Sequence, residues 1–196
     1  RDKVLSGRQK DAIRQYVRMH TDKPEELYQI YHAMIRGENY KAETLEVLME
    51  EGQPVIKIAG NEIRAAFEQL NDFVQKLILL TERTLPLGSV VEIDVRKLEM
   101  ETEKPVSSIK AVIVDRFMKK ETEKQYVPYC GIIYPFGDSK KQLFFTEQAI
   151  HTVIHYGYTD RQEDAYVALI KREIIKKGYS SYSFAEAEDD KIRMLQ

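Results

Sequence analysis

The sequence has no tryptophan and only one cysteine, Cys130, among its 196 residues. One cysteine cannot form an internal disulfide, so the chain is not a disulfide-stapled secreted domain. We therefore expect a reducing compartment, the cytoplasm. Hydrophobic residues make up 43% of the chain, which is enough for a core and argues against a disordered protein.

The sequence also has no large excess of one charge and no long apolar run. The 30 lysines and arginines nearly balance the 32 aspartates and glutamates, so the whole chain has no electrostatic preference for nucleic acid or anionic membranes. The longest apolar run is residues 77–80, whereas a membrane span needs roughly 18 to 20 residues. We expect no nucleic-acid partner and no membrane insertion.

Signatures of catalysis and of cofactor binding are absent as well. The chain has no phosphate-binding glycine loop and no serine nucleophile elbow. His151 and His155 would share a face on a helix and could then hold a metal. However, Val153 and Ile154 favour a strand, where the histidines lie about 13 Å apart and cannot share an ion. We expect no catalytic residue, no metal and no cofactor.

Cys130 lies in "YVPYCGIIYPFG", residues 126–137, within a run of aromatic and branched residues. A catalytic cysteine needs a helix N-terminus, a cation or a histidine to lower its pKa, whereas a cysteine within a strand usually acts as a small hydrophobe. We interpret Cys130 as structural and Gly131 as a bulge or a point of close packing. Tyr134-Pro135-Phe136-Gly137 has the pattern of a type I turn. An enzyme that uses Cys130 or the two histidines is the alternative.

In the first part of the chain, apolar residues recur at helical spacing. This pattern predicts four helices, over residues 4–17, 22–37, 45–52 and 60–83. Asp22 is the expected N-cap of the second helix, with Glu25 three residues later, and Gly37 ends it. The apolar stripe of the last helix is wide, so this helix either forms the core of the segment or mediates self-association into a homo-oligomer.

After Pro86 the apolar period changes toward two, which is typical of strands. Strands are predicted at 90–95, 109–117, 126–134, 141–145 and 151–157, with a helical turn at 146–150. Asp160 then begins a helix that ends at Gly178, with an apolar face formed by Tyr166, Leu169, Ile170 and Ile174.

These patterns predict an α+β fold, with a helical N-terminal half and a small antiparallel β-sheet domain that has a closing helix. The expected divisions are a helical segment at 1–83, an α+β domain at 85–178 and an acidic C-terminal tail at 179–196. The chain has 12 tyrosines and seven phenylalanines, residue types that are enriched at interfaces. Tyr28, Tyr179 and Tyr182 are the candidate partner-binding residues, whereas Tyr31 is assigned to the core.

Four stretches follow one another in an order typical of one bacterial family: "LPLGSVVEI" (85–93), "IKAVIVDRF" (109–117), "YVPYCGIIYPFG" (126–137) and "LFFTEQAIHTVIHYGYTDRQEDAYVALI" (143–170). Over residues 85–177 the chain resembles the family of domain of unknown function 4176. The matching motifs are residues 85–91, Tyr134-Pro135 with Gly137, Phe144-Phe145 and Gly157-Tyr158. Two features depart from the family pattern: a longer loop at 98–108, and Val114-Asp115-Arg116 where members often have a Gly-Arg pair.

The resemblance implies a context rather than a chemistry. Such domains are similar to proteins encoded beside type VII secretion substrates of Gram-positive bacteria, especially LXG-type toxins. It implies a non-enzymatic cytoplasmic accessory protein that binds a secreted toxin as chaperone or targeting factor. The alternatives are an immunity protein that neutralises a cognate toxin, and an uncharacterised enzyme. Export motifs of the form Tyr-x-x-x-Asp/Glu occur twice, as often as chance predicts, so they do not indicate whether this protein is itself exported.

Overall fold

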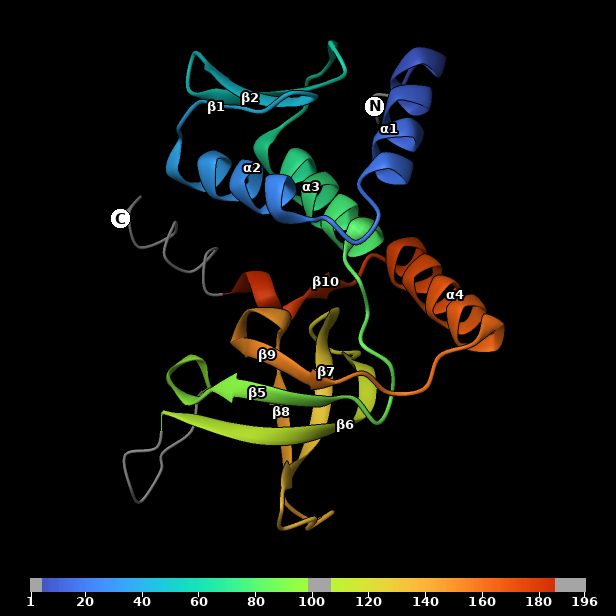
Figure 1. Ribbon diagram of the computed structural model, residues 1–196. Helices are drawn as coiled ribbons and strands as arrows, with labels where there is room; N and C mark the ends of the chain where they lie inside the picture. The colour runs from blue at the N-terminus through green and yellow to red at the C-terminus, as the bar shows by residue number, and fades with distance from the viewer. Residues whose placement is uncertain (1–4, 99–106, 186–196) are drawn as a thin grey trace. The chain divides into compact units, whose positions relative to one another are not determined.

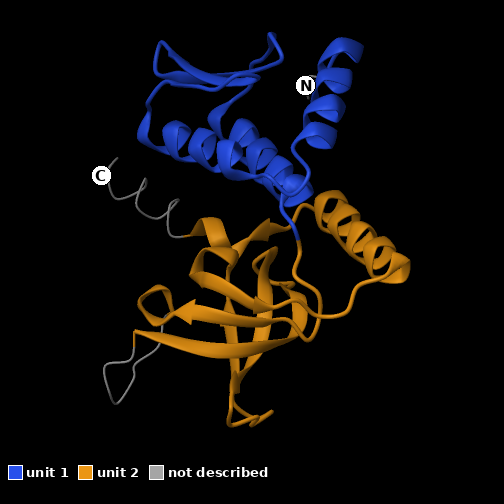
Figure 2. Ribbon diagram, in the orientation of Figure 1, with its two compact units in different colours: residues 1–83, 187–196 blue, residues 84–186 orange. Residues whose placement is uncertain are grey.

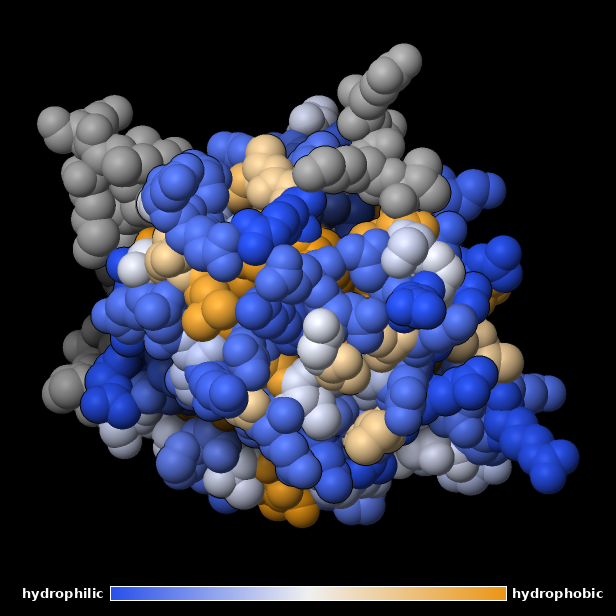
Figure 3. Space-filling view, turned by 90° about the horizontal axis from the view of Figure 1, so that it is seen from above, coloured by the Kyte–Doolittle hydropathy of each residue, from blue (hydrophilic) through white to orange (hydrophobic). Residues whose placement is uncertain are grey.

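The computed structural model of the chain describes residues 5–98 and 107–185 (Figure 1). The chain forms two compact units (Figure 2): unit 1 comprises residues 1–83 and 187–196, and unit 2 comprises residues 84–186. Both units combine helices with largely antiparallel sheets, so the predicted α+β fold class is confirmed. No helix within the described ranges is long and apolar enough to cross a membrane. The face in Figure 3 is mostly hydrophilic, with hydrophobic residues in small areas between polar ones.

Three helices form much of unit 1: α1 (Gly7–Met19), α2 (Glu25–Arg36) and α3 (Phe67–Thr81). A capping box begins α1, because the Ser6 hydroxyl accepts from the Gln9 backbone while the Gln9 side chain accepts from the Ser6 backbone. Gly37 ends α2 in the left-handed conformation, as predicted. Tyr31 is buried on α2, which confirms its assignment to the core.

Two of the predicted helix starts are wrong. Pro24, not Asp22, is the N-cap of α2, and Asp22 has a positive φ of 61°. Proline suits a helix start because its φ is fixed near the helical value. The predicted helix at 60–83 begins only at Phe67, because residues 61–63 belong to a strand.

The predicted helix at 45–52 is also wrong, since this segment belongs to a four-stranded antiparallel sheet. Its strands are β1 (Tyr40–Lys41), β2 (Leu45–Glu50), β3 (Gln53–Ile58) and β4 (Asn61–Ile63), in the order β1-β2-β3-β4. Leu45 and Val47 are buried with a less buried residue between them, which is the period of a strand. Glu51 and Gly52 both have positive φ and form a two-residue hairpin turn, so Gly52 reverses a strand rather than ending a helix.

Unit 2 is built on a six-stranded sheet. Its strands are β5 (Val90–Asp94), β6 (Ser108–Lys120), β7 (Gln125–Tyr134), β8 (Gln142–Phe145), β9 (Ile150–His155) and β10 (Ser180–Ser181). Their order is β10-β7-β6-β5-β9, with β8 paired to β7 beyond this path. All pairings are antiparallel except β10 with β7. The strands expected from the sequence are thus confirmed, with small shifts at their ends.

One apolar core lies on this sheet, formed by Leu85, Val91, Ile93, Ala111, Ile113, Tyr129, Leu143, Phe145 and Ala149. The register between β6 and β7 shifts between Ile113 and Asp115, opposite Gly131 and Cys130. A Cβ atom on Gly131 would lie only 3.1 Å from the Val112 carbonyl oxygen. Both the bulge and the close packing expected at Gly131 are therefore present. In the turn after β7, Gly137 N donates to Ile133 O rather than to Tyr134 O, the acceptor expected of a hydrogen-bonded type I turn over residues 134–137.

Short 3-10 helices connect the strands: η1 (Val95–Lys97), η2 (Glu147–Ala149) and η3 (Tyr182–Phe184). The turn expected at 146–150 is thus η2, although the Thr146 side chain makes no capping hydrogen bond. The helix α4 (Arg161–Lys177) begins and ends as predicted, at Asp160 and Gly178. Its predicted apolar face is only partly correct, since Ile174 is buried whereas Tyr166 and Leu169 are exposed.

The predicted acidic tail does not begin at residue 179. Ser180 and Ser181 pair with β7 as β10, and η3 follows with Phe184 buried. Residues 179–184 therefore complete the sheet of unit 2. Residues 186–196, the rest of the predicted tail, lie outside the described residues, as do positions 99–106 of the long loop.

Candidate functional site

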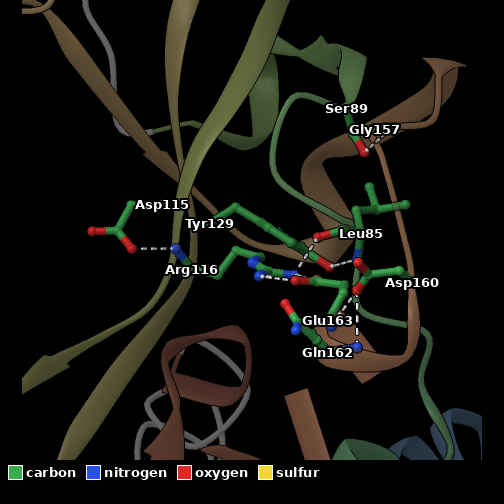
Figure 4. A network of polar contacts seen from close by, with 9 residues as sticks. All are labelled: Leu85, Ser89, Asp115, Arg116, Tyr129, Gly157, Asp160, Gln162 and Glu163. Atoms are coloured by element: carbon green, nitrogen blue, oxygen red, sulfur yellow. Dashed lines mark hydrogen bonds and ion pairs between the residues drawn. The ribbon is translucent and has the colours of Figure 1, made fainter. Parts of the chain in front are cut away.

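Two of the motifs that carry the family resemblance, residues 85–91 and Gly157-Tyr158, contribute to a network of polar contacts that includes the buried Arg116 (Figure 4). Arg116 projects from β6, and its Nη1 donates to the Leu85 carbonyl oxygen at 3.2 Å. The guanidinium also donates two hydrogen bonds to the Glu163 carboxylate of α4, one of them from Nη2 to Oε2 at 3.2 Å. The Arg116 side chain is 3% exposed and that of Glu163 21%. Two parallel charge-assisted hydrogen bonds fix the helix start to the sheet.

Two further hydrogen bonds hold the segment 85–89 in place. The Tyr129 hydroxyl accepts from Leu85 N at 3.1 Å, and the Ser89 Oγ accepts from Gly157 N at 3.0 Å. The backbone at Gly157 leaves no room for a side chain, because a Cβ atom there would lie 2.0 Å from the Leu87 carbonyl oxygen. We call Leu85, Ser89, Arg116, Tyr129, Gly157 and Glu163 the motif clasp.

Asp160 completes the start of α4, since its Oδ1 accepts from Gln162 N and Glu163 N at 2.9 Å each. Glu163 is three residues after this N-cap, the position of the acidic residue in a capping box, but its carboxylate is engaged by Arg116 instead. The charges and hydroxyls of the motif clasp all take part in contacts that join four segments: residues 85–89, β6, β7 and residues 157–163. The clasp is therefore a structural element, and the surface that it positions is the place to look for function.

Cys130 is only 2% exposed and lies on β7. Burial, and to a lesser extent the Asp115 carboxylate, raise the pKa of its thiol. A raised pKa reduces the thiolate fraction that a nucleophile needs. His151 and His155 are on β9, and β6 and β5 lie between that strand and β7 in the sheet. These observations favour the structural interpretation of Cys130.

We predict that Cys130 reacts slowly with a thiol reagent such as 5,5′-dithiobis(2-nitrobenzoate) in the native protein and rapidly in urea. The reason is that unit 2 must open before the buried thiol is reached. The absorbance of the released thiolate measures the rate, and free cysteine at the same pH is the control. Native labelling at the rate of free cysteine would contradict the burial of this side chain.

His151 and His155 lie on β9, so the strand predicted for them is confirmed. Both side chains are exposed. Within residues 5–98 and 107–185, no three histidine, cysteine or acidic side chains are grouped so that they could hold a metal ion.

The three tyrosines predicted to bind a partner have different environments. Tyr28, in unit 1, is half-buried and its hydroxyl donates to Glu82 at 2.9 Å. Tyr179 is 3% exposed, donates to Glu121 and lies beneath Lys124, so its side chain packs within unit 2. Tyr182 is half-buried, with the Lys120 ammonium 5.9 Å from its ring centroid. Tyr182 also lines a groove of unit 2.

This groove, of about 1080 Å³, is the basic groove of unit 2. Its lining combines apolar and aromatic side chains with five cations, and its described part contains no aspartate or glutamate. The lining residues that matter below are Arg96, Lys97, Lys119, Lys120, Lys141, all of β8, and Tyr182. The balanced composition of the chain concealed this local excess of positive charge.

Acidic residues outside the lining hold three of these cations. Arg96 pairs with Asp94 at 2.8 Å, Lys119 with Glu173 at 3.2 Å and Lys120 with Glu123 at 3.3 Å. The hydrogen bond from Arg96 lowers the pKa of Asp94 to about 2.

The other two cations that line the groove are Lys97 and Lys141. Lys97 donates to the Gln148 carbonyl oxygen at 2.7 Å, and its charge also helps to lower the pKa of Asp94. Within the described ranges neither Lys97 nor Lys141 forms an ion pair, so these two lysines give the groove its excess of positive charge.

Unit 2 also carries large exposed apolar side chains in two regions, one around Gly157 and one on α4. We call them the exposed apolar set; it comprises Leu87, Ile154, Tyr156, Tyr158, Tyr166 and Leu169. Tyr158 is 81% exposed and Leu169 61%. Tyr166 and Leu169 are three residues apart on α4 and share a face. Tyr166 and Leu169 could not be identified as surface residues from the sequence, because their spacing is also that of a buried helix face.

In the comparisons with known proteins, the match to a family model lies within unit 2. No curated protein and no solved structure matches the chain. The match that does exist covers both halves of the motif clasp, from the segment 84–89 to the first turns of α4. Residues 84–166 match the model of the family described as Domain of unknown function (DUF4176), which confirms the resemblance recognised in the sequence.

Proposed function

We propose that this protein is a non-enzymatic accessory factor that binds a secreted LXG-type toxin, as its chaperone or targeting factor for type VII secretion. The family resemblance supplies the context of this proposal. The observation that carries it is the exposed apolar set of unit 2. Docking of the toxin would cover these side chains.

The composition of the exposed apolar set suits a protein partner. Three of its six members are tyrosines, whose rings offer a large apolar area and whose hydroxyls still form hydrogen bonds. Such residues are enriched at the energetic centres of interfaces. The Leu87 carbonyl lies close to Gly157, between Tyr156 and Tyr158, and exposed apolar patches are typical of interaction sites.

The motif clasp holds the exposed apolar set in place. The Leu87 carbonyl adjoins Gly157, so Leu87 and the residues beside Gly157, Tyr156 and Tyr158, project from neighbouring backbone. The Arg116–Glu163 pair anchors the helix that carries Tyr166 and Leu169. A surface fixed before binding loses less conformational entropy when the partner docks. This links the motifs of the family to a binding function without catalytic residues.

The test is co-purification with the LXG toxins encoded beside this protein. The double substitution Tyr158→Ala with Leu169→Ala is expected to weaken binding at least about tenfold, since truncating residues at the centre of an interface costs on the order of 1–2 kcal/mol each. Isothermal titration calorimetry measures the change. Phe136→Ala is the matched control, because Phe136 is 82% exposed in the same unit but outside the exposed apolar set. Equal losses in the two variants would contradict the assigned surface.

The toxin domain to which this protein binds distinguishes an accessory role from an immunity role. We expect binding to the N-terminal domain or the linker of the toxin, with toxin activity unchanged. Binding to the C-terminal domain with loss of toxin activity would replace the proposal with an immunity function. Failure to bind any neighbouring LXG toxin would overturn the proposal.

A further inference from the structure

Strand β8 is an edge strand that lies along the basic groove. It pairs with β7 through residues 142–145, and the described part of the chain places no strand on its other side. All four β8 residues line the groove, although Leu143 and Phe145 are buried in the core while Gln142 and Phe144 are exposed. The groove therefore contacts residues that point to both faces of β8, as well as side chains of β6 and β7. An edge strand presents a row of unpaired N–H and C=O groups.

The charges of the groove select the kind of chain that can pair there. Lys141 directly precedes β8, and Lys97 faces the groove from η1. Their charges have no acidic partner among the described residues that line the groove. Side-chain carboxylates of an incoming strand would supply this partner, and complementary charge both speeds association and fixes the register of the strand.

We infer that the basic groove binds an extended acidic segment of a partner protein, which adds to the free edge of β8 as a further strand. The backbone of that segment pairs with β8, as in other cases of strand addition. Its carboxylates meet Lys97 and Lys141, and an apolar side chain covers Phe144. This surface is separate from the exposed apolar set, so the inference does not depend on the identity of the toxin.

A single-stranded nucleic acid is the other polyanion that a basic, aromatic groove can take. The structure favours a peptide because a strand edge offers hydrogen-bonding groups at the spacing of a peptide backbone, which a phosphodiester chain does not match. Three of the five cations are already held by carboxylates, which lowers the charge available to phosphates. The oligonucleotide is therefore a competitor in the experiment.

The experiment measures fluorescence anisotropy of a labelled peptide of alternating glutamate and valine with the full chain. We expect binding at low salt that weakens strongly at about 1 M salt, where the screening length falls to about 3 Å. Lys97→Glu with Lys141→Glu is expected to weaken binding about tenfold, since close charge pairs across an interface contribute this much. Lys110→Glu is the matched control, because Lys110 is exposed on β6 outside the groove.

Two readouts separate this inference from a loss of folding and from the proposed function. Amide exchange of residues 142–145 should slow when the peptide binds, and Phe144→Ala should weaken binding while Cys130 labelling stays slow. The Tyr158→Ala, Leu169→Ala variant should bind the peptide normally. Failure of the glutamate–valine peptide to bind would overturn the inference. Three other results would also overturn the inference. They are equal binding of a lysine–valine peptide, tighter binding of an oligothymidylate, and an equal loss of peptide binding in the Lys110→Glu control.

Discussion

Replacing Glu163 with glutamine is expected to destabilise unit 2 by about 3 kcal/mol, the lower end of the range for breaking a buried ion pair. The Arg116 guanidinium is 3% exposed, so without Glu163 its charge would remain buried with only the Leu85 carbonyl and the amide oxygen as acceptors. Glu163 is 21% exposed, which allows some water to reach the site and limits the loss. The substitution keeps the size of the side chain, so charge is the main quantity that changes.

The single cysteine provides a measurement specific to unit 2. The urea dependence of Cys130 labelling reports the opening of this unit, and far-ultraviolet circular dichroism reports both units. Glu123→Gln is the control: its pair with Lys120 is about half exposed, and such pairs contribute at most about 1 kcal/mol. Arg116→Met with Glu163→Leu should be more stable than Glu163→Gln, because no unpaired charge is then buried. A double variant less stable than Glu163→Gln would contradict this explanation.

The strands of unit 2 could be predicted because their signal is local. Residues 109–117 and 126–134 are rich in branched and aromatic residues and are bounded by polar loops, a pattern that favours strands. Residues 45–58 show the limit of the method. The run Leu45-Glu46-Val47-Leu48 fits both a helix and a strand, and Glu51-Gly52 lacks the asparagine or aspartate that usually marks a two-residue hairpin. Pairing with β3, a contact beyond the local pattern, decides the outcome.

The motif clasp could not be predicted because its contacts join distant positions. Arg116 and Glu163 are 47 residues apart, and Leu85 and Tyr129 are 44 apart. The one signal in the sequence was the charged pair Asp115-Arg116, which lies between apolar residues of the strand. We interpreted this pair only as a departure from the family pattern. The basic groove could not be predicted for the same reason, since its cations come from three separate segments and lie together only in the folded unit.

Replacing Gly157 with alanine is expected to destabilise unit 2 by about 3 kcal/mol, at the upper end of the usual cost of overpacking. The new Cβ would lie 2.0 Å from the Leu87 carbonyl oxygen and 2.9 Å from Ser89 N. Both contacts are to backbone atoms, so rotation of a side chain cannot relieve the clash. The backbone of residues 87–89 therefore has to move. That movement also lengthens the hydrogen bond from Gly157 N to the buried Ser89 Oγ. Cys130 labelling in urea measures the loss.

The control for Gly157→Ala is Gly137→Ala, which tests backbone strain without a clash. Gly137 has a φ of 66° and open space around it, so alanine there should cost about 1 kcal/mol. Equal losses in the two variants would show that Gly157 is not required for close packing. Because Leu87 belongs to the exposed apolar set, Gly157→Ala should also weaken toxin binding under conditions in which unit 2 stays folded. Glu163→Gln, by contrast, acts on the helix that carries Tyr166 and Leu169. Comparing the two variants therefore shows which half of the exposed apolar set the partner uses.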